Sequence, residues 1–433
     1  MEDVEGQGFK VIYKQKDRDM WDRIATILIS LAITLSWFPG YITGVLYDKF
    51  GLTRWITVPL ILISFLIEFK IYIAILIKPV IIGLVLATMI GMGGGVATGA
   101  VPIKTLLDFI PSLLIFVFYA RTRDPKKCRN ILISLLIGSW VLCIIITLAG
   151  FGLVPSEESV LIKDFYSGTF ERTFAGVSTT LLGPWVAILV GLLGGSIFCQ
   201  NGIKKMVLGP LSLLIVTFVT LITAQRAIAL IAVLGSFMAL IGIMIGGNQK
   251  TKRDNKIKNK IRYTKLSFIF FIIFSILLFM VTKQIISEKT FTLKYRFLAI
   301  TISQDYATVQ RLDMWSYFIK DLITKPMLIG QGQREFIEYV GTVPHLIIGE
   351  AYYNGGILML AALVIIMVVG LDSMLNVSFR SDSIESIILG RGLLNILLLT
   401  SIYLMLNPGF ITRIPYVLFG LAFGISGSTN KHH

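Results

Sequence analysis

The chain has 433 residues, of which 55% are hydrophobic and only 15% are Asp, Glu, Lys or Arg. Soluble domains carry about 25% charged residues, and the apolar residues here lie in long runs. This composition excludes a set of soluble domains and predicts an all-α polytopic membrane protein. The formal charge is +15, from 40 Lys and Arg against 25 Asp and Glu. Basic loops that fix membrane topology explain it, so no nucleic-acid partner is expected.

Long apolar runs recur from residue 24 onward. The segment before them, residues 1–23, is polar and of mixed charge, and no cleavable signal peptide is expected because the first run is long enough to span. The twelve candidate spans are residues 24–46, 54–69, 72–93, 103–120, 131–151, 178–198, 206–224, 227–246, 266–283, 353–371, 391–406 and 413–427. This number places both termini on the same side of the membrane.

Basic residues in short loops predict the orientation of these spans. Lys and Arg are concentrated in residues 121–129, 204–205 and 250–265. In the twelve-span order all three loops and the N-terminus fall on one side, which the positive-inside rule assigns to the cytoplasm. Lys78 is placed to reach the same interface.

The opposite side carries a long loop, residues 284–352, of about 69 residues. Within it, residues 306–324 place Val309, Leu312, Trp315, Phe318, Ile319 and Leu322 at near-helical spacing. We predict an amphipathic helix on the outer membrane interface, ended by Lys325-Pro326. The chain is then predicted to divide into a cytoplasmic segment 1–23, nine spans in 24–283, the periplasmic loop 284–352, three spans in 353–427, and a tail 428–433, in which His432 and His433 are interpreted as a tag remnant.

The glycine-rich stretch Gly91–Gly95 breaks a span near its outer end. Two interpretations fit such a stretch, a re-entrant segment or a bent helix end that lies close to a neighbouring backbone. The second interpretation is the favoured one.

Arginines near the outer boundary are candidates for anion binding. Arg226 is the only charge between spans seven and eight, and an arginine placed against the usual charge bias suggests a ligand, although it could also anchor topology or contact lipid headgroups. Arg311 is either a solvated residue paired with Asp305 or Asp313, or a second ligand of the same anion. Two convergent guanidinium groups suit a diphosphate. Three further arginines could support them: Arg172, Arg296 and Arg334.

His345 is the only histidine before the C-terminal pair, and it lies at the end of the long loop. A lone histidine is commonly structural, but an imidazole here could take a proton from a sugar hydroxyl. The sequence contains no Cys/His cluster, phosphate-binding loop or serine nucleophile motif. We therefore predict neither a metal nor a cofactor.

Together these features resemble the O-antigen polymerase and O-antigen ligase superfamily of bacterial membrane glycosyltransferases. The resemblance rests on about twelve spans with inside termini, the lone arginine in Gln225-Arg226-Ala227, the Arg311-x-x-x-Trp315 helix that leads to Gly330-Gln331-Gly332, and His345. In the family the histidine is followed by about nine residues and a glycine that starts the next helix, and Gly356 stands at that position. The residue after the histidine is usually Asn or Ser in the family, and here it is Leu346.

The resemblance implies a fold of the GT-C type in the bacterial inner membrane, with the active site facing the periplasm. It implies a donor glycan linked to undecaprenyl diphosphate. Arg226 and Arg311 would bind the diphosphate, with Arg172, Arg296, Arg334 and Gln331 as possible support, and His345 would orient or deprotonate the acceptor hydroxyl. Direct displacement at the sugar C1 would invert the anomeric centre without a metal or a nucleotide.

The acceptor stays open. A polymerase would use a lipid-linked repeat unit, with a chain-length regulator as a possible partner, and a ligase would use lipid A–core. We favour a polymerase because the residue after His345 departs from the usual pattern. A protein O-glycosyltransferase and a transporter or flippase of lipid-linked sugars are further alternatives, although transporters often have two related halves and we find none here. A structural scaffold would leave the long loop unexplained.

Overall fold

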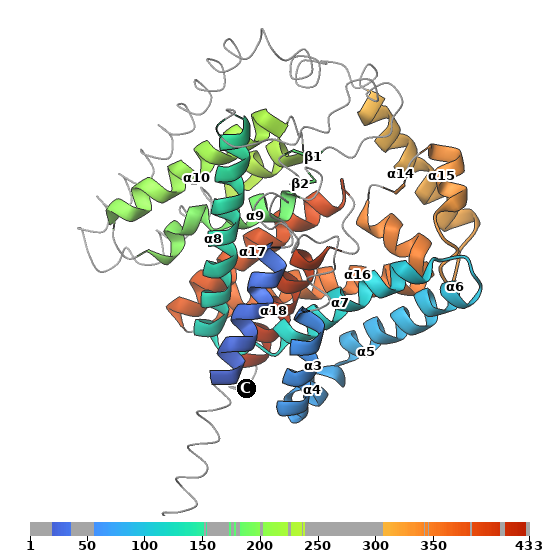
Figure 1. The fold of residues 1–433 in the computed structure, drawn as a ribbon, viewed down its shortest axis with the longest axis horizontal. Coiled ribbons are helices and arrows are strands. Elements are labelled where there is room, and N and C mark those ends of the chain that lie inside the picture. Colours follow the sequence, from blue (N-terminus) through green and yellow to red (C-terminus); the bar gives the residue numbers. More distant parts are fainter. Residues whose placement is uncertain are drawn as a thin grey trace, which may run out of the picture.

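The computed structural model describes residues 20–35, 56–150, 153, 173–174, 177–178, 182–199, 202–223, 227–235, 237–238, 306–341, 343–344, 346–381, 383–407 and 412–429 (Figure 1). This part of the chain is helical, except for one short antiparallel pair in which Thr173–Phe174 (β1) lies beside Val177–Ser178 (β2). The prediction of an all-helical fold is confirmed for these residues.

The helices of the first half are 20–35, α3 (Val58–Ile67), α4 (Phe69–Leu76), α5 (Pro79–Leu86), the π-helical turn Ala87–Met92, α6 (Gly93–Ala97), α7 (Ile103–Ala120), α8 (Pro125–Gly150), α9 (Gly183–Gly191), the 3₁₀ turn Leu193–Phe198, α10 (Gly202–Thr223) and 227–235. The second half contains α14 (Tyr306–Thr324), α15 (Arg334–Val340), α16 (Ile347–Arg380), α17 (Ile384–Leu404) and α18 (Arg413–Thr429).

Five helices in the described ranges are long and apolar enough to cross a membrane: Pro79–Ala97, Ile103–Ala120, Pro125–Ala149, Ile347–Phe379 and Glu385–Leu404. The bent pair formed by α3 and α4 would bring the number to six. Shorter apolar helices lie at Gly183–Phe198, Val207–Thr220 and Arg413–Ser426. These helices support the expected membrane protein. The predicted span 266–283 lies outside the described residues, and the total of twelve stays a prediction.

The second and third predicted spans, 54–69 and 72–93, differ from the helices found. The chain bends by 103° between α3 and α4, and the helix that follows begins at Pro79 instead of residue 72. Proline suits the first turn of a helix because its missing N–H would be unsatisfied there in any case. The bend lies at Glu68, whose carboxylate binds Arg121 at 2.5 Å.

At one end of the molecule, ion pairs connect the start of the first helix, the bend between α3 and α4, and the loop after α7. Asp22 binds both Arg121 and Lys127, and Glu68 also binds Arg121. Burial alone would raise the pKa of Asp22, but the cationic partners Arg121 and Lys127 outweigh it and lower the pKa below its usual 3.8. The first helix therefore begins at the same end as the basic loop 121–129. We call this the Arg121 end.

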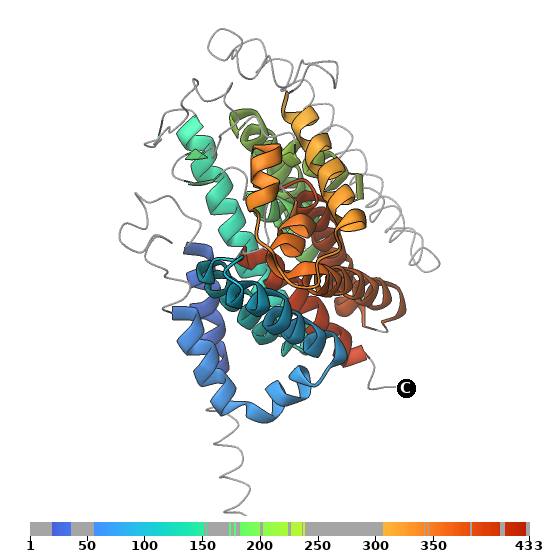
Figure 2. The same cartoon turned by 90° about the vertical axis from the view of Figure 1, so that its right-hand side faces the viewer.

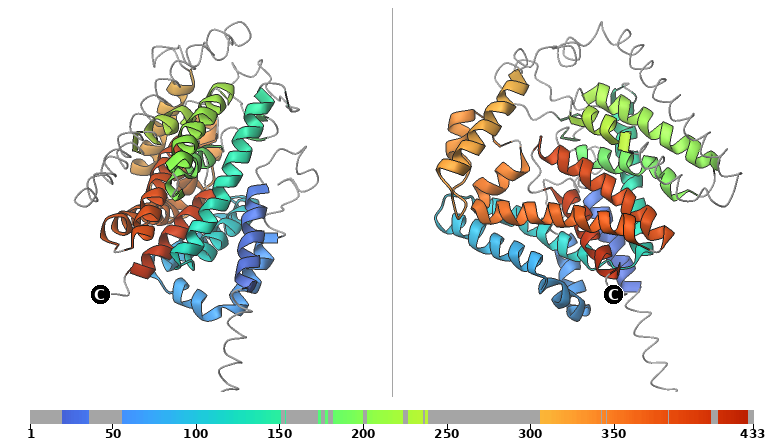
Figure 3. Two further views of the ribbon diagram at one scale, coloured as in Figure 1. Left: turned by 90° about the vertical axis from the view of Figure 1, so that its left-hand side faces the viewer. Right: turned by 180° about the vertical axis from the view of Figure 1, so that it is seen from behind.

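The opposite end, which we call the α14 end, holds α14, α15, α6 and the start of α16. All views place α14 and α15 far from α3 and α4 (Figures 1 and 2). Helix α10 lies across the bundle from α14 and α15 (Figure 3). Between the two ends, α7 and α18 run parallel. Phe109 packs on Tyr416 at 5.7 Å between ring centroids and Phe116 on Phe423 at 5.4 Å, so both helices begin at the α14 end.

Candidate functional site

Helix α14 spans the residues predicted for the amphipathic segment, 306–324, and ends before Lys325-Pro326 as expected. One face of the helix is buried against the rest of the protein. Met314 and Phe318 are 1% and 3% exposed and pack in a small aromatic cluster, whereas Leu312 and Ile319 are 57% and 46% exposed. Of the predicted apolar stripe, Phe318 is buried and Trp315 and Leu322 are partly buried against the cluster. The exposed Leu312 and Ile319 are open to the membrane interface on which this helix is predicted to lie, and that position stays a prediction.

The buried face of α14 also contains a carboxylate. Asp321 is 7% exposed, and the Tyr353 hydroxyl donates a hydrogen bond of 3.0 Å to its Oδ2 atom. The adjacent Tyr352 hydroxyl donates to the Lys325 carbonyl at 2.8 Å and accepts from the Met327 backbone N–H at 3.3 Å. These bonds tie the C-terminal end of α14 to the start of α16.

Close backbone contacts hold the turn after α14 against the end of the span that begins at Pro79. The Gly330 N–H donates to the Gly91 carbonyl at 3.0 Å. A Cβ atom on Gly91 would lie 2.2 Å from the Gly355 carbonyl oxygen, and one on Gly95 would lie 2.5 Å from that of Gly330. The close approach to another backbone, one part of the favoured interpretation of Gly91–Gly95, is confirmed. The expected break is wrong, because the chain stays helical through these residues as far as Ala97.

Replacing Gly91 by alanine is expected to destabilise the protein by about 1–3 kcal/mol, because the new Cβ atom would meet the backbone carbonyl of Gly355, which cannot rotate away. Gly83 lies on the same apolar span, and a Cβ there has no atom within 4 Å. Gly83→Ala should therefore leave stability unchanged or raise it by up to about 1 kcal/mol. Thermal unfolding of both purified variants in micelles measures the difference. Equal melting temperatures would contradict the close contact.

Gly356, the glycine expected to start the next helix, interrupts α16. Its backbone has φ 67° and ψ −166°, a conformation that favours glycine. A Cβ atom there would lie 2.3 Å from the Leu328 carbonyl oxygen. The Ile357 N–H donates a hydrogen bond of 2.8 Å to the Met327 carbonyl instead of to a carbonyl of its own helix. The long part of α16 therefore begins directly after Gly356.

Arg311 lies on the bundle side of α14, about half a helical turn from Asp313. Residues two apart in a helix do not face each other, so the geometry disfavours Asp313 as its partner. Its guanidinium group is close enough to the Tyr403 hydroxyl, near the C-terminal end of α17, to act on it electrostatically. Arg311 therefore lies on the face of α14 that is turned toward α17.

Arg413 is a residue that the sequence analysis missed. It is the first residue of α18, it is only 8% exposed, and it lies ten positions after Tyr403 in the sequence. A positive charge at a helix N-terminus is unfavourable unless an anion compensates it. The available signal was the one used for Arg226, a single charge between two apolar runs joined by a short loop.

Negative charge is also present at the α14 end. Glu350 lies in the first turn of α16 and is close enough to Tyr416 on α18 to act on it electrostatically. The starts of α16 and α18 are therefore neighbours. Asp108 on α7 precedes Phe109, which packs on the same tyrosine.

Two of the predicted supporting residues are exposed. Gln331 lies in the turn between α14 and α15. Arg334 begins α15, and its side chain is 90% exposed and pairs with Glu338 at 2.8 Å. This hydrogen bond and the Glu338 charge raise the pKa of Arg334. An exposed pair of this kind contributes little to stability.

The other predicted site residues lie outside the described residues: His345, Arg226, Arg172 and Arg296. Leu346, the unusual neighbour of the histidine, is 1% exposed in the aromatic cluster under α14. An apolar side chain fits that environment, so packing accounts for leucine at this position.

No group of three or more His, Cys, Asp or Glu able to hold a metal ion occurs in the part of the chain that the structure describes. No protein-family model matches this chain, and no curated protein matches its sequence. The fold and the site together define a helical protein with several candidate membrane spans and cationic side chains at one end of its bundle.

Proposed function

We propose that the protein is a membrane glycosyltransferase of the GT-C type, and that it transfers a glycan from an undecaprenyl-diphosphate-linked donor to a sugar hydroxyl at the outer face of the bacterial inner membrane. We propose an O-antigen polymerase as the particular activity. The observation that carries the proposal is the position of Arg311 on α14, where its charge acts electrostatically on Tyr403 near the C-terminal end of α17.

The chemistry needs a group that stabilises negative charge on the donor. The acceptor oxygen attacks C1 of the donor sugar, the bond from C1 to the phosphate oxygen breaks, and the electron pair leaves with the diphosphate. Arg311 and Arg226 neutralise that developing charge, and the buried Arg413 is a third candidate for the same task. His345 accepts the proton of the attacking hydroxyl. Attack opposite the leaving group inverts the configuration at C1.

The site also needs a fixed position for α14, because a charge displaced by even about 1 Å loses much of its effect. The hydrogen bond from Tyr353 to Asp321 supplies one connection to the bundle. The backbone contact between Gly330 and Gly91 supplies another. Both support a helix held firmly over the site.

Transfer can be tested with purified protein in micelles and a lipid-linked oligosaccharide donor. A glycosyltransferase produces free undecaprenyl diphosphate and a longer glycan, whereas a transporter produces neither. The acceptor is then identified in a deletion strain by gel analysis of surface polysaccharide. A single repeat unit on the core indicates a polymerase, and full-length chains left on undecaprenyl diphosphate indicate a ligase. Absence of any released diphosphate from a folded protein would refute the proposed reaction.

A further inference from the structure

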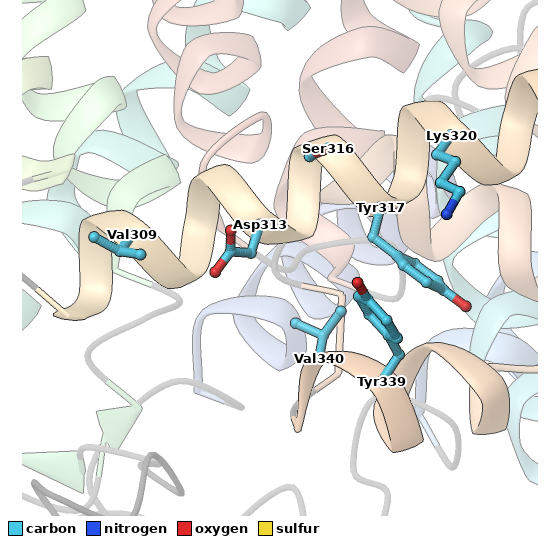
Figure 4. Close-up of a pocket in the computed structure, with 7 residues that line it drawn as sticks. All are labelled: Val309, Asp313, Ser316, Tyr317, Lys320, Tyr339 and Val340. Atoms are coloured by element: carbon cyan, nitrogen blue, oxygen red, sulfur yellow. The ribbon is translucent and has the colours of Figure 1, made fainter. Parts of the chain in front are cut away.

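A pocket of about 410 Å³ lies between α14 and α15, on the face of α14 turned away from Arg311. Its volume is within the range of about 300–1,000 Å³ that is usual for small-molecule sites. The polar lining comes from Asp313, Ser316 and Lys320 on α14, and the aromatic lining from Tyr317 and Tyr339 (Figure 4). The α14 residues are spaced so that they share one face of the helix.

Two tyrosine rings form one wall of this pocket. Tyr317 and Tyr339 are stacked, with 4.3 Å between ring centroids and 24° between ring planes. Tyr339 is 71% exposed. It is not the main anchor of its helix, because Phe336 on α15 is fully buried and packs on Tyr353 at 5.0 Å between ring centroids.

Charged groups of both signs line the same pocket. Figure 4 shows the Asp313 and Lys320 side chains on the side of α14 that faces α15, with Lys320 next to the Tyr317 ring. One carboxylate and one ammonium group give the pocket no net charge. Such a lining disfavours a lipid tail, because of the charges, and it disfavours a diphosphate, because Asp313 would repel it.

We infer that this pocket binds a sugar ring of an oligosaccharide. The C–H face of a pyranose packs on an aromatic ring as other apolar surfaces do. The Asp313 carboxylate accepts hydrogen bonds from ring hydroxyls, and Lys320 and Ser316 donate them. The combination of an aromatic wall and convergent polar groups fits a saccharide better than a wholly apolar or ionic ligand.

The pocket and Arg311 lie on opposite faces of α14, so about one helix diameter, ~10 Å, separates them. A sugar in the pocket is therefore not the sugar at the breaking bond. If the proposed function holds, the pocket takes a distal residue of the glycan that is being extended.

Saturation-transfer NMR tests the pocket directly, with the protein in lipid nanodiscs so that no sugar detergent competes. The probes are maltotriose and triacetylchitotriose. We expect saturation transfer to the ring protons of at least one probe. Tyr339→Ala should weaken binding about tenfold, and Tyr339→Phe should retain it because stacking needs only the ring. Phe379→Ala is the matched control, since Phe379 is also an exposed aromatic residue (63%) and lies near the far end of α16.

Binding of neither trisaccharide would overturn the inference, as would equal binding by the wild type and a folded Tyr339→Ala variant. Folding of each variant is checked by thermal unfolding. The inference and the proposed function fail separately. Sugar binding that depends on Tyr339 without any glycan transfer would leave the pocket standing and remove the transferase. Glycan transfer without sugar binding at this pocket would leave the proposed function standing and remove the pocket.

Discussion

Replacing Arg311 by alanine is expected to lower the rate of glycan transfer by about 10²–10³-fold, the usual loss when one well-placed charge donor is removed from a reacting oxygen. The protein should still fold, because Arg311 is not part of the aromatic cluster that holds α14 to the bundle. Release of undecaprenyl diphosphate from a lipid-linked donor measures the effect. A folded variant with near wild-type rates would remove Arg311 from the site.

Arg334→Ala is the matched control for this prediction. Arg334 lies on α15, close to α14 in the sequence, but its side chain is 90% exposed and pairs with Glu338. We expect its loss to change the transfer rate by less than about threefold, because exposed charges are screened by solvent and salt. Arg311→Lys adds a further comparison. It keeps the charge but loses the bidentate geometry, so intermediate activity would indicate an anionic ligand.

Some elements could be predicted closely from the sequence because strong local signals mark both ends. Helix α7 covers the predicted span 103–120, since the apolar run lies between Pro102 and Arg121. Helix α14 covers the predicted 306–324 for a similar reason, with Pro326 beyond its end. In both helices the boundary is set by residues next to it in the chain.

Other features depend on partners far away in the sequence and could not be predicted. Glu68, at the bend between α3 and α4, pairs with Arg121, which is 53 positions later. The buried carboxylate of Asp321 on α14 accepts a hydrogen bond from Tyr353, which is 32 positions later. From the sequence, an aspartate in an amphipathic helix is expected to be exposed to solvent. Only the tertiary contact shows otherwise.

Arg121 illustrates the same limit for charge. It was counted among the loop arginines that set topology, but its side chain is 8% exposed and lies between the carboxylates of Asp22 and Glu68. Its guanidinium carbon is also 4.1 Å from the centroid of the Phe118 ring. The positive-inside rule counts arginines without regard to burial. At this position the arginine joins the first helix, the α3–α4 bend and the end of α7.

Arg121→Ala should therefore destabilise the protein by about 3–5 kcal/mol, because it leaves two carboxylates in a buried site with only Lys127 beside one of them. Arg129→Ala is the matched control from the same basic loop. Arg129 pairs with Glu385 at 3.3 Å, and the two side chains are 42% and 38% exposed, so its loss should cost no more than about 1 kcal/mol. Thermal unfolding in micelles gives both values.

A compensated variant separates lost attraction from unpaired charge. Adding Asp22→Asn and Glu68→Gln to Arg121→Ala removes the buried charges that have lost their partner, and it should restore part of the melting temperature. If the single variant melts like Arg129→Ala, the cluster contributes no more than a surface pair. If the compensated variant melts lower than Arg121→Ala, packing of the arginine stem and Phe118, rather than charge, holds the three helix ends together.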